Sequence, residues 1–105
     1  MARFAQHARL RAQAGRRDDL LAKFLEVVDM QRDNPACEVM LVSSSPGEDD
    51  VLFLTEVWRS TEEYERARES PEVQAWAAGM PALVAGPPEI TPLDLRGGKG
   101  LAAEG

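Results

Sequence analysis

The sequence predicts an α+β fold in the ferredoxin-like order β-α-β-β-α-β, with a four-stranded antiparallel sheet and both helices on one of its faces. Two observations lead to this prediction. Segments with the alternation or the continuous apolar run of a strand are interspersed with segments of helical period. The two middle strands are separated only by loop-forming residues, which indicates a hairpin. Residues 1–96 are expected to form one domain of this fold, and residues 97–105, rich in Gly and Ala, a flexible C-terminal tail.

The first strand is expected over residues 3–12, RFAQHARLRA. Its even-numbered positions are apolar except for Gln6, whereas its odd-numbered positions carry His7 and several arginines, so the two sets point to opposite faces of the sheet. Gly15 then marks a turn. From Arg16 onward the apolar residues recur with helical spacing, at Leu20, Leu21, Phe24, Leu25 and Val28. The pair Asn34-Pro35 is expected to end this helix.

The second and third strands are expected over residues 37–44 (CEVMLVSS) and 51–58 (VLFLTEVW). The third is nearly all apolar, which predicts a strand inside the sheet that is buried on both faces. Glu56 is the exception, because it points to the same side as Leu54 and Trp58. A carboxylate among apolar side chains needs a partner. Two interpretations remain open: Glu56 is paired with a neighbouring arginine or with water, or Glu56 and Trp58 line a cavity.

The second helix is expected to begin after Ser60, because Ser60 and Glu63 have the spacing of a capping box. Ser70 followed by Pro71 is a second start signal, so the helix is expected to break there and to continue at a new angle to about Met80. The last strand is expected over residues 89–95, EITPLDL, where the proline is typical of a sheet edge.

With both helices on one face, the other face of the sheet is left uncovered. The strands direct apolar side chains to both faces, so the uncovered face is expected to expose a larger apolar patch than monomers usually show. A homodimer formed through this open face would bury the patch. His7, Arg9 or Arg11 are then expected to meet Glu38 or another acidic residue across the interface.

Composition argues against several classes of function. The net charge is −6 and is spread along the chain, so neither nucleic acid nor an anionic membrane is an expected partner. A single cysteine, Cys37, excludes a disulfide within the chain. No leader and no apolar run approaching about 18 residues is present, so a cytoplasmic location is expected. One His and one Cys do not make a Cys/His zinc site, and no metal is expected.

The segments 35–37 (Pro-Ala-Cys), 56–58 (Glu-Val-Trp) and 70–71 (Ser-Pro), in this order and at these separations, resemble the antibiotic biosynthesis monooxygenase (ABM) family of dimeric α+β barrels. The similarity runs over roughly residues 3–95. The resemblance implies a sheet-to-sheet dimer with a pocket in each subunit between the sheet and the helices. For several members of the family it also implies oxygenation of a phenolic or quinol substrate without metal or flavin, so no cofactor is expected.

Such a reaction needs side chains that remove a proton, stabilise an oxyanion and exclude water. The catalytic candidates are His7, the only imidazole, and Tyr64, which has a hydroxyl to donate; each also has a common structural role in packing. The substrate-binding candidates are Trp58 and Trp76, which either stack on a flat ligand or belong to the core, together with Glu56 and Gln6. Arg59 or Arg66 are weaker candidates for holding an anionic group.

The sequence also departs from the family pattern. Many members of the family carry a His on the second helix, a few residues before the Ser-Pro. This chain has Ala67 in that region. The haem-degrading branch carries an Asn, a Trp and a His where this chain offers Ala8, Ala67 and Ala77, so haem degradation is disfavoured. Two hypotheses follow: a cofactor-independent monooxygenase acting on a small phenol, quinol or anthrone-type substrate, or a non-catalytic dimer that binds a small hydrophobic metabolite or a protein partner.

Overall fold

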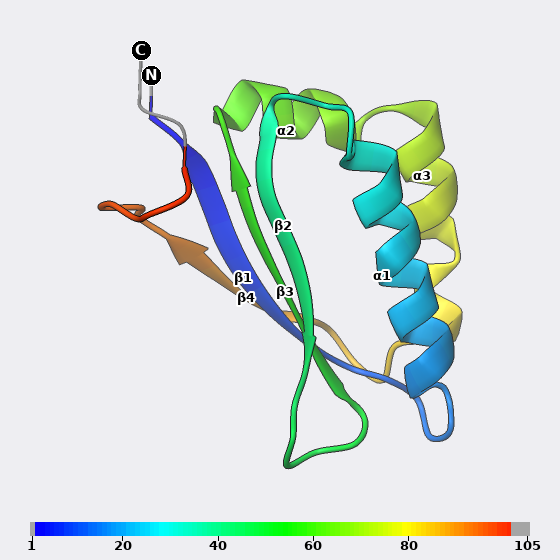
Figure 1. Ribbon diagram of the computed structural model, residues 1–105. Helices are drawn as coiled ribbons and strands as arrows, with labels where there is room; N and C mark the ends of the chain where they lie inside the picture. Colours follow the sequence, from blue (N-terminus) through cyan, green and yellow to red (C-terminus); the bar gives the residue numbers. More distant parts are fainter. Residues whose placement is uncertain (1, 102–105) are drawn as a thin grey trace.

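The sheet has the strand order β2-β3-β1-β4, and all neighbouring strands are antiparallel. The structure, a computed structural model, describes residues 2–101. Its strands are β1 (Phe4–Arg11), β2 (Cys37–Ser44), β3 (Val51–Trp58) and β4 (Glu89–Leu93). Its helices are α1 (Arg17–Gln31), α2 (Thr61–Arg68), α3 (Pro71–Ala78) and the 3-10 turn η1 (Met80–Ala82). The helices cover one face of the sheet, and the predicted ferredoxin-like α+β fold is confirmed (Figure 1).

Local signals in the sequence predicted the positions of most helices and strands. Both strands of the hairpin have the predicted bounds, and β3 lies inside the sheet between β2 and β1. Gly15, in the turn before α1, has φ +75°, a backbone conformation that glycine adopts without steric cost. The second helix breaks at Ser70, where the hydroxyl accepts a hydrogen bond from the backbone N–H of Val73 (3.3 Å) and begins α3.

The core lies between the sheet and α1. Leu20, Phe24 and Val27 of α1 pack against Ala8, Leu10, Ala12 and Leu52 of the sheet, together with Leu83. Cross-strand pairing sets Gln6 of β1 opposite Glu56 of β3 and Phe4 opposite Trp58. Because alternate residues of a strand share a face, these four side chains lie on the face that the helices cover, as Ala8 and Leu10 do.

The open face carries the opposite set of side chains. His7 pairs in register with Thr55 on one side and with Thr91 on the other. Leu41 and Leu93 also point to this face, and they are 57% and 40% exposed. The open face therefore combines a polar central row with exposed aliphatic side chains near its edges.

The charged residues of the open face have partners within the same chain. Arg3 forms an ion pair with Glu38 (2.6 Å), the residue expected to meet a partner subunit. Arg9 binds Glu48 and Glu89, and Arg11 binds Asp50 and Glu48. Glu48 and Asp50 lie in the loop between β2 and β3, and Glu89 begins β4, so these arginines have acidic partners within their own subunit. Pairing across an interface stays a prediction.

Residues 94–101, the last that the structure describes, form no helix or strand. Of the predicted tail, residues 102–105 lie outside the described part of the chain. Among residues 2–101, no helix has both the length and the apolar character needed to cross a membrane.

Candidate active site

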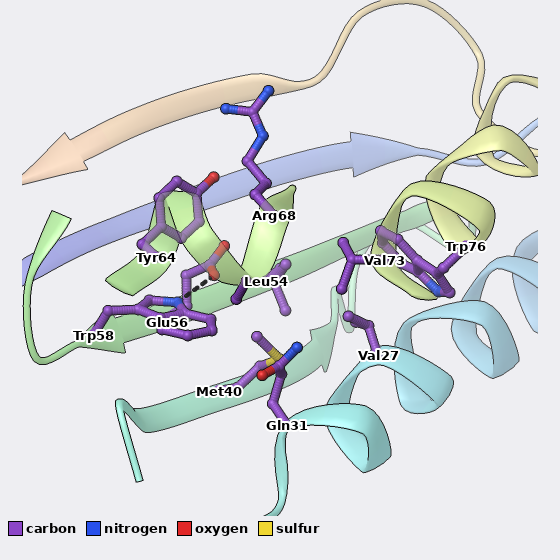
Figure 2. A pocket seen from close by; sticks show the side chains of 11 residues that line it. Val27, Gln31, Met40, Leu54, Glu56, Trp58, Tyr64, Arg68, Val73 and Trp76 are labelled. Carbon is purple, nitrogen blue, oxygen red and sulfur yellow. Dashed lines mark hydrogen bonds between the residues drawn. The ribbon is translucent and has the colours of Figure 1, made fainter. Parts of the chain in front are cut away.

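A cavity of about 100 Å³ lies between the sheet and the helices, at the end of the sheet where α2 and α3 meet (Figure 2). Its walls come from five elements that are distant in the sequence. They are Val27 and Gln31 of α1, Met40 of β2, Leu54, Glu56 and Trp58 of β3, Tyr64, Ala67 and Arg68 of α2, and Val73 and Trp76 of α3. An engineered apolar cavity of about 150 Å³ binds benzene, so this volume is in the range of a single ring.

Glu56 is the buried charge in the cavity wall, with only 5% of its surface exposed. Its Oε1 accepts a hydrogen bond from the indole Nε1 of Trp58 (2.8 Å; dashed in Figure 2), and its Oε2 accepts one from the amide Nε2 of Gln6 (2.8 Å). Both donors are neutral. A carboxylate has about four acceptor positions, so these two bonds fix its orientation and leave acceptor capacity for a ligand.

Tyr64 places a hydroxyl next to this carboxylate. The ring stacks on Phe4 with a centroid distance of 4.1 Å, and it meets Trp58 edge-on at 5.7 Å. Gln6 Nε2 donates a second hydrogen bond to the Tyr64 hydroxyl (3.2 Å), so one amide connects the phenol and the carboxylate. The position of Tyr64 depends on the start of α2, where the Ser60 hydroxyl accepts from the backbone N–H of Glu63 (3.2 Å). The carboxylate of Glu63 binds Arg59.

The tryptophans differ in how far they belong to the core. Trp58 is 2% exposed, and its ring forms the wall beside Glu56. Trp76 donates its indole N–H to the backbone carbonyl of Lys23 (2.6 Å) and packs at 6.0 Å from Phe24, while another part of its ring borders the cavity. Trp76 therefore joins α3 to α1 and closes the apolar side of the cavity.

The charge of Glu56 also affects the pKa of a residue on the adjacent strand, β2. Cys37, at the start of β2, has its pKa raised to about 11, first because burial disfavours the thiolate and second because Glu56 is negative. A thiol with this pKa is a poor nucleophile near neutral pH. Cys37 therefore acts as a packing residue beside the cavity.

The structure brings together most of the side chains that the sequence singled out. The cavity is lined by Glu56, Trp58, Tyr64 and Trp76. Gln6 donates hydrogen bonds to two of these residues, Glu56 and Tyr64. His7 lies on the open face of the sheet, where Nδ1 is 2.9 Å from the Thr55 hydroxyl and the imidazole stacks on Phe53 at 5.4 Å. Within residues 2–101, no group of three or more His, Cys, Asp or Glu side chains is arranged to hold a metal ion.

Two polar residues of the cavity were missed by sequence reasoning. Gln31 lies four residues after Val27 and seven after Phe24, so it continues the buried stripe of α1; a polar residue on an apolar stripe was the available signal. Arg68 lies four residues after Tyr64 on α2, so the two share a helix face. Arg68 is exposed, and Figure 2 shows its side chain extending past Tyr64, so the guanidinium is at the rim of the cavity.

Comparisons with known proteins agree on one family. The family model for antibiotic biosynthesis monooxygenases matches residues 3–79. A candidate antibiotic biosynthesis monooxygenase of known structure from Chloroflexus aurantiacus J-10-fl is 30% identical, with a TM-score of 0.77 over 96% of this chain and 100% of that one. A comparison with curated protein sequences finds no significant match.

More distant structures share the fold. Rv0793 from Mycobacterium tuberculosis has a TM-score of 0.83 at 22% identity, over 93% of this chain and 99% of that one. A mutant of SnoaB, a cofactor-independent oxygenase from Streptomyces nogalater, has a TM-score of 0.81 at 15% identity, over 94% of this chain and 98% of that one.

Proposed function

The chain belongs to the antibiotic biosynthesis monooxygenase family, and we propose on this premise that it is a cofactor-independent monooxygenase that oxidises a small phenol, quinol or anthrone-type substrate with dioxygen. One observation carries the proposal: a buried carboxylate, Glu56, is held by two neutral donors in the wall of an apolar cavity of single-ring size. The similarity in fold to SnoaB, a cofactor-independent oxygenase, supports the same class of reaction.

The proposed base is Glu56. An electron-rich ring reacts with dioxygen as its phenolate or enolate, so the first step is removal of a proton. Gln6 and Trp58 hold the carboxylate in place, and its remaining acceptor positions take the proton from the substrate. Tyr64, hydrogen-bonded through Gln6 to the same carboxylate, donates its hydroxyl to the oxyanion that forms.

The reaction is balanced without a further reductant. Glu56 removes one proton from the substrate, the resulting anion transfers one electron to dioxygen, and the two radicals combine to form a carbon–oxygen bond. Cleavage of the O–O bond and loss of water then leave a ring carbonyl. One oxygen atom enters the product and the other leaves as water, which takes up the proton that Glu56 removed. The substrate supplies all four electrons: from the CH2 carbon in an anthrone, and from the ring with its hydroxyl groups in a phenol or quinol.

The cavity limits what such a substrate looks like. Trp58 and Trp76 supply flat walls against which a ring can pack, with stacking contacts of about 0.5–1.5 kcal/mol beyond the area buried. The volume holds one ring, so additional rings of a larger substrate are expected to extend past Arg68 at the rim.

His7 was a candidate base on chemical grounds, and this role stays a prediction. His7 lies on the face of the sheet opposite the cavity, with its imidazole packed on Phe53. We therefore assign direct proton transfer in the cavity to Glu56. Any contribution of His7 to the reaction would be made from the open face of the sheet.

A homodimer through the open face is part of the proposal. Leu41 and Leu93 expose aliphatic surface there, at opposite edges of the sheet. A second copy related by a two-fold axis presents the same surface, so a single contact buries the open faces of both subunits. Light scattering is expected to give the mass of a dimer at micromolar concentration, and a well-folded monomer would contradict the proposal.

Oxygen consumption tests the activity. Wild-type protein in chelator-treated buffer is expected to consume oxygen with anthrone or a substituted quinol, above the rate of the uncatalysed reaction. Glu56→Gln keeps the shape of the side chain and is expected to lower the rate about 100-fold or more, the usual contribution of a general base, whereas Tyr64→Phe is expected to have a smaller effect.

His7→Ala tests the predicted role of the imidazole on the open face separately, and a loss of rate as large as that in Glu56→Gln would assign the base to His7 instead. An unchanged rate in Glu56→Gln would refute the assignment of the base. Binding of these compounds without any oxygen uptake would instead support the second hypothesis, a non-catalytic dimer that binds a small hydrophobic metabolite.

A further inference from the structure

Gln31 is a buried amide whose nitrogen has no protein partner. Only 9% of the residue is exposed, and the side chain extends from the last turn of α1 to the cavity. No hydrogen bond from its Nε2 to any of residues 2–101 is present. The nitrogen is not sealed off, because among residues 2–101 no fully buried side-chain nitrogen or oxygen lacks a hydrogen-bond partner, so this donor is open to water or to a ligand in the cavity.

The direction of this amide is fixed by its neighbours. The backbone N–H of Ala36 can only donate, and it donates to Oδ1 of Asn34 (3.1 Å). Nδ2 of Asn34 is therefore its free end, and it donates to Oε1 of Gln31 (3.0 Å). Amide oxygen and nitrogen are often interchangeable in a structure, but this chain of bonds starts from a backbone donor and leaves one consistent assignment. Figure 2 shows the Gln31 nitrogen on the side of Val27, with the oxygen turned away.

The cavity therefore has two polar ends of opposite kind. Glu56, on the sheet, offers an acceptor, and Gln31, on α1, offers a donor. The surface between them is apolar, formed by Met40, Leu54 and Val73. A flat ligand that spans the cavity is complementary to this arrangement when it has a hydroxyl at one end and an oxygen acceptor at the other.

We propose that Gln31 is a specificity-determining donor, which favours substrates that carry a second ring oxygen opposite the hydroxyl that Glu56 deprotonates. This inference rests on the proposed function, because it assigns the substrate of the same cavity. One hydroxyl of the quinol donates to Glu56, and the second oxygen accepts from Nε2 of Gln31. When the ring is oxidised to the quinone level, this second oxygen becomes a carbonyl oxygen, a better acceptor than a phenolic hydroxyl, so the hydrogen bond from Gln31 becomes stronger along the reaction.

Anaerobic binding of two matched ligands tests this inference. Hydroquinone and phenol differ only in the second hydroxyl, and exclusion of oxygen separates binding from turnover. Titration calorimetry with wild-type protein is expected to show hydroquinone binding about three- to tenfold tighter than phenol, the preference that one net hydrogen bond supplies.

Two variants remove the donor in different ways. Gln31→Met keeps the length of the side chain without a polar hydrogen, and Gln31→Glu keeps the oxygen that Asn34 binds. Gln31→Met is expected to reduce the preference for hydroquinone to about onefold. The carboxylate of Gln31→Glu accepts instead of donating, so this variant is expected to lose affinity for 4-methoxyphenol, whose second oxygen can only accept. Gln31→Met is also expected to leave the affinity for phenol within about twofold of wild type. Gln13→Glu makes the same charge change at an exposed position after β1 and is expected to keep the wild-type preference.

The outcomes separate this inference from the proposed function. A wild-type preference that persists in Gln31→Met, a wild type without any preference, or a wild type that binds neither ligand would overturn the role of Gln31. A preference that depends on Gln31, together with no oxygen uptake, would support the binding role and refute only the monooxygenase activity. Circular dichroism of each variant checks that the fold is retained.

Discussion

Trp58→Phe measures how strongly the protein holds the carboxylate of Glu56. The substitution keeps an aromatic ring at a site that is 2% exposed, and it removes the indole N–H that lies 2.8 Å from Oε1. A hydrogen bond to a charged group is worth about 1.5–3 kcal/mol. The smaller ring also loses packing contacts worth about 1 kcal/mol. The free energy of unfolding is therefore expected to fall by about 2.5–4 kcal/mol, the sum of these two losses.

Urea denaturation followed by circular dichroism, at a fixed protein concentration, measures this loss. The same substitution in a Glu56→Leu background is expected to cost only the packing part, about 1 kcal/mol or less, because the charge is no longer present. Trp76→Phe is the matched control. Its indole N–H donates to a neutral backbone carbonyl, that of Lys23, so its cost is expected to be independent of Glu56. A Trp58→Phe cost that differs by less than about 0.5 kcal/mol between the two backgrounds would refute the role given to the indole.

Three further expectations follow from single residues. Asp50 is half-buried, and its hydrogen bonds with Arg11 lower its pKa. Its contribution to stability is therefore present above the pKa of the unfolded chain, about 3.9, and is lost as the pH falls through the lower folded value. The drop in the urea midpoint between pH 7 and pH 3 should be larger in wild type than in Asp50→Asn; equal drops would contradict this coupling. Cys37, with its pKa raised to about 11, should react with iodoacetamide at pH 8 about 100-fold more slowly in the folded protein than in urea, as followed by mass spectrometry; equal rates would show an accessible thiolate. Leu41→Lys on the open face should convert the proposed dimer to a monomer in light scattering, whereas Leu25→Lys, at an exposed position on α1, should not; a dimer that survives Leu41→Lys would place the interface elsewhere.

The elements of this fold are encoded locally, and for that reason the sequence predicted them closely. The continuous apolar run 51–58, bounded by loop residues, has the bounds of β3 in the structure. Ser70-Pro71 ended one helix and began the next because a side-chain cap and a fixed proline φ act within a single turn. The last strand is shorter than expected, ending at Leu93, since β4 lies at an edge and pairs only with β1.

The candidate site was predicted in part. Glu56, Trp58, Tyr64 and Trp76 were singled out by residue type and by their places on β3 and the helices, and all four line the cavity. Gln31 was not, although its place on the buried stripe of α1 was a signal, because a polar residue near the end of an amphipathic helix commonly faces solvent. The orientation of its amide comes from Asn34 and Ala36, which come into place only after the loop has folded.

The sequence by itself determined which side chains share a face: alternation along β1 separates Gln6 from His7 whatever the rest of the chain does. Only the tertiary structure decided which of those faces the helices cover, and so which residue meets Glu56. The reason is physical. Alternation depends on neighbours two residues apart, whereas the choice of covered face depends on how α1, α2 and α3 pack together against the whole sheet. For this reason Gln6 lies at the cavity and His7 on the open face.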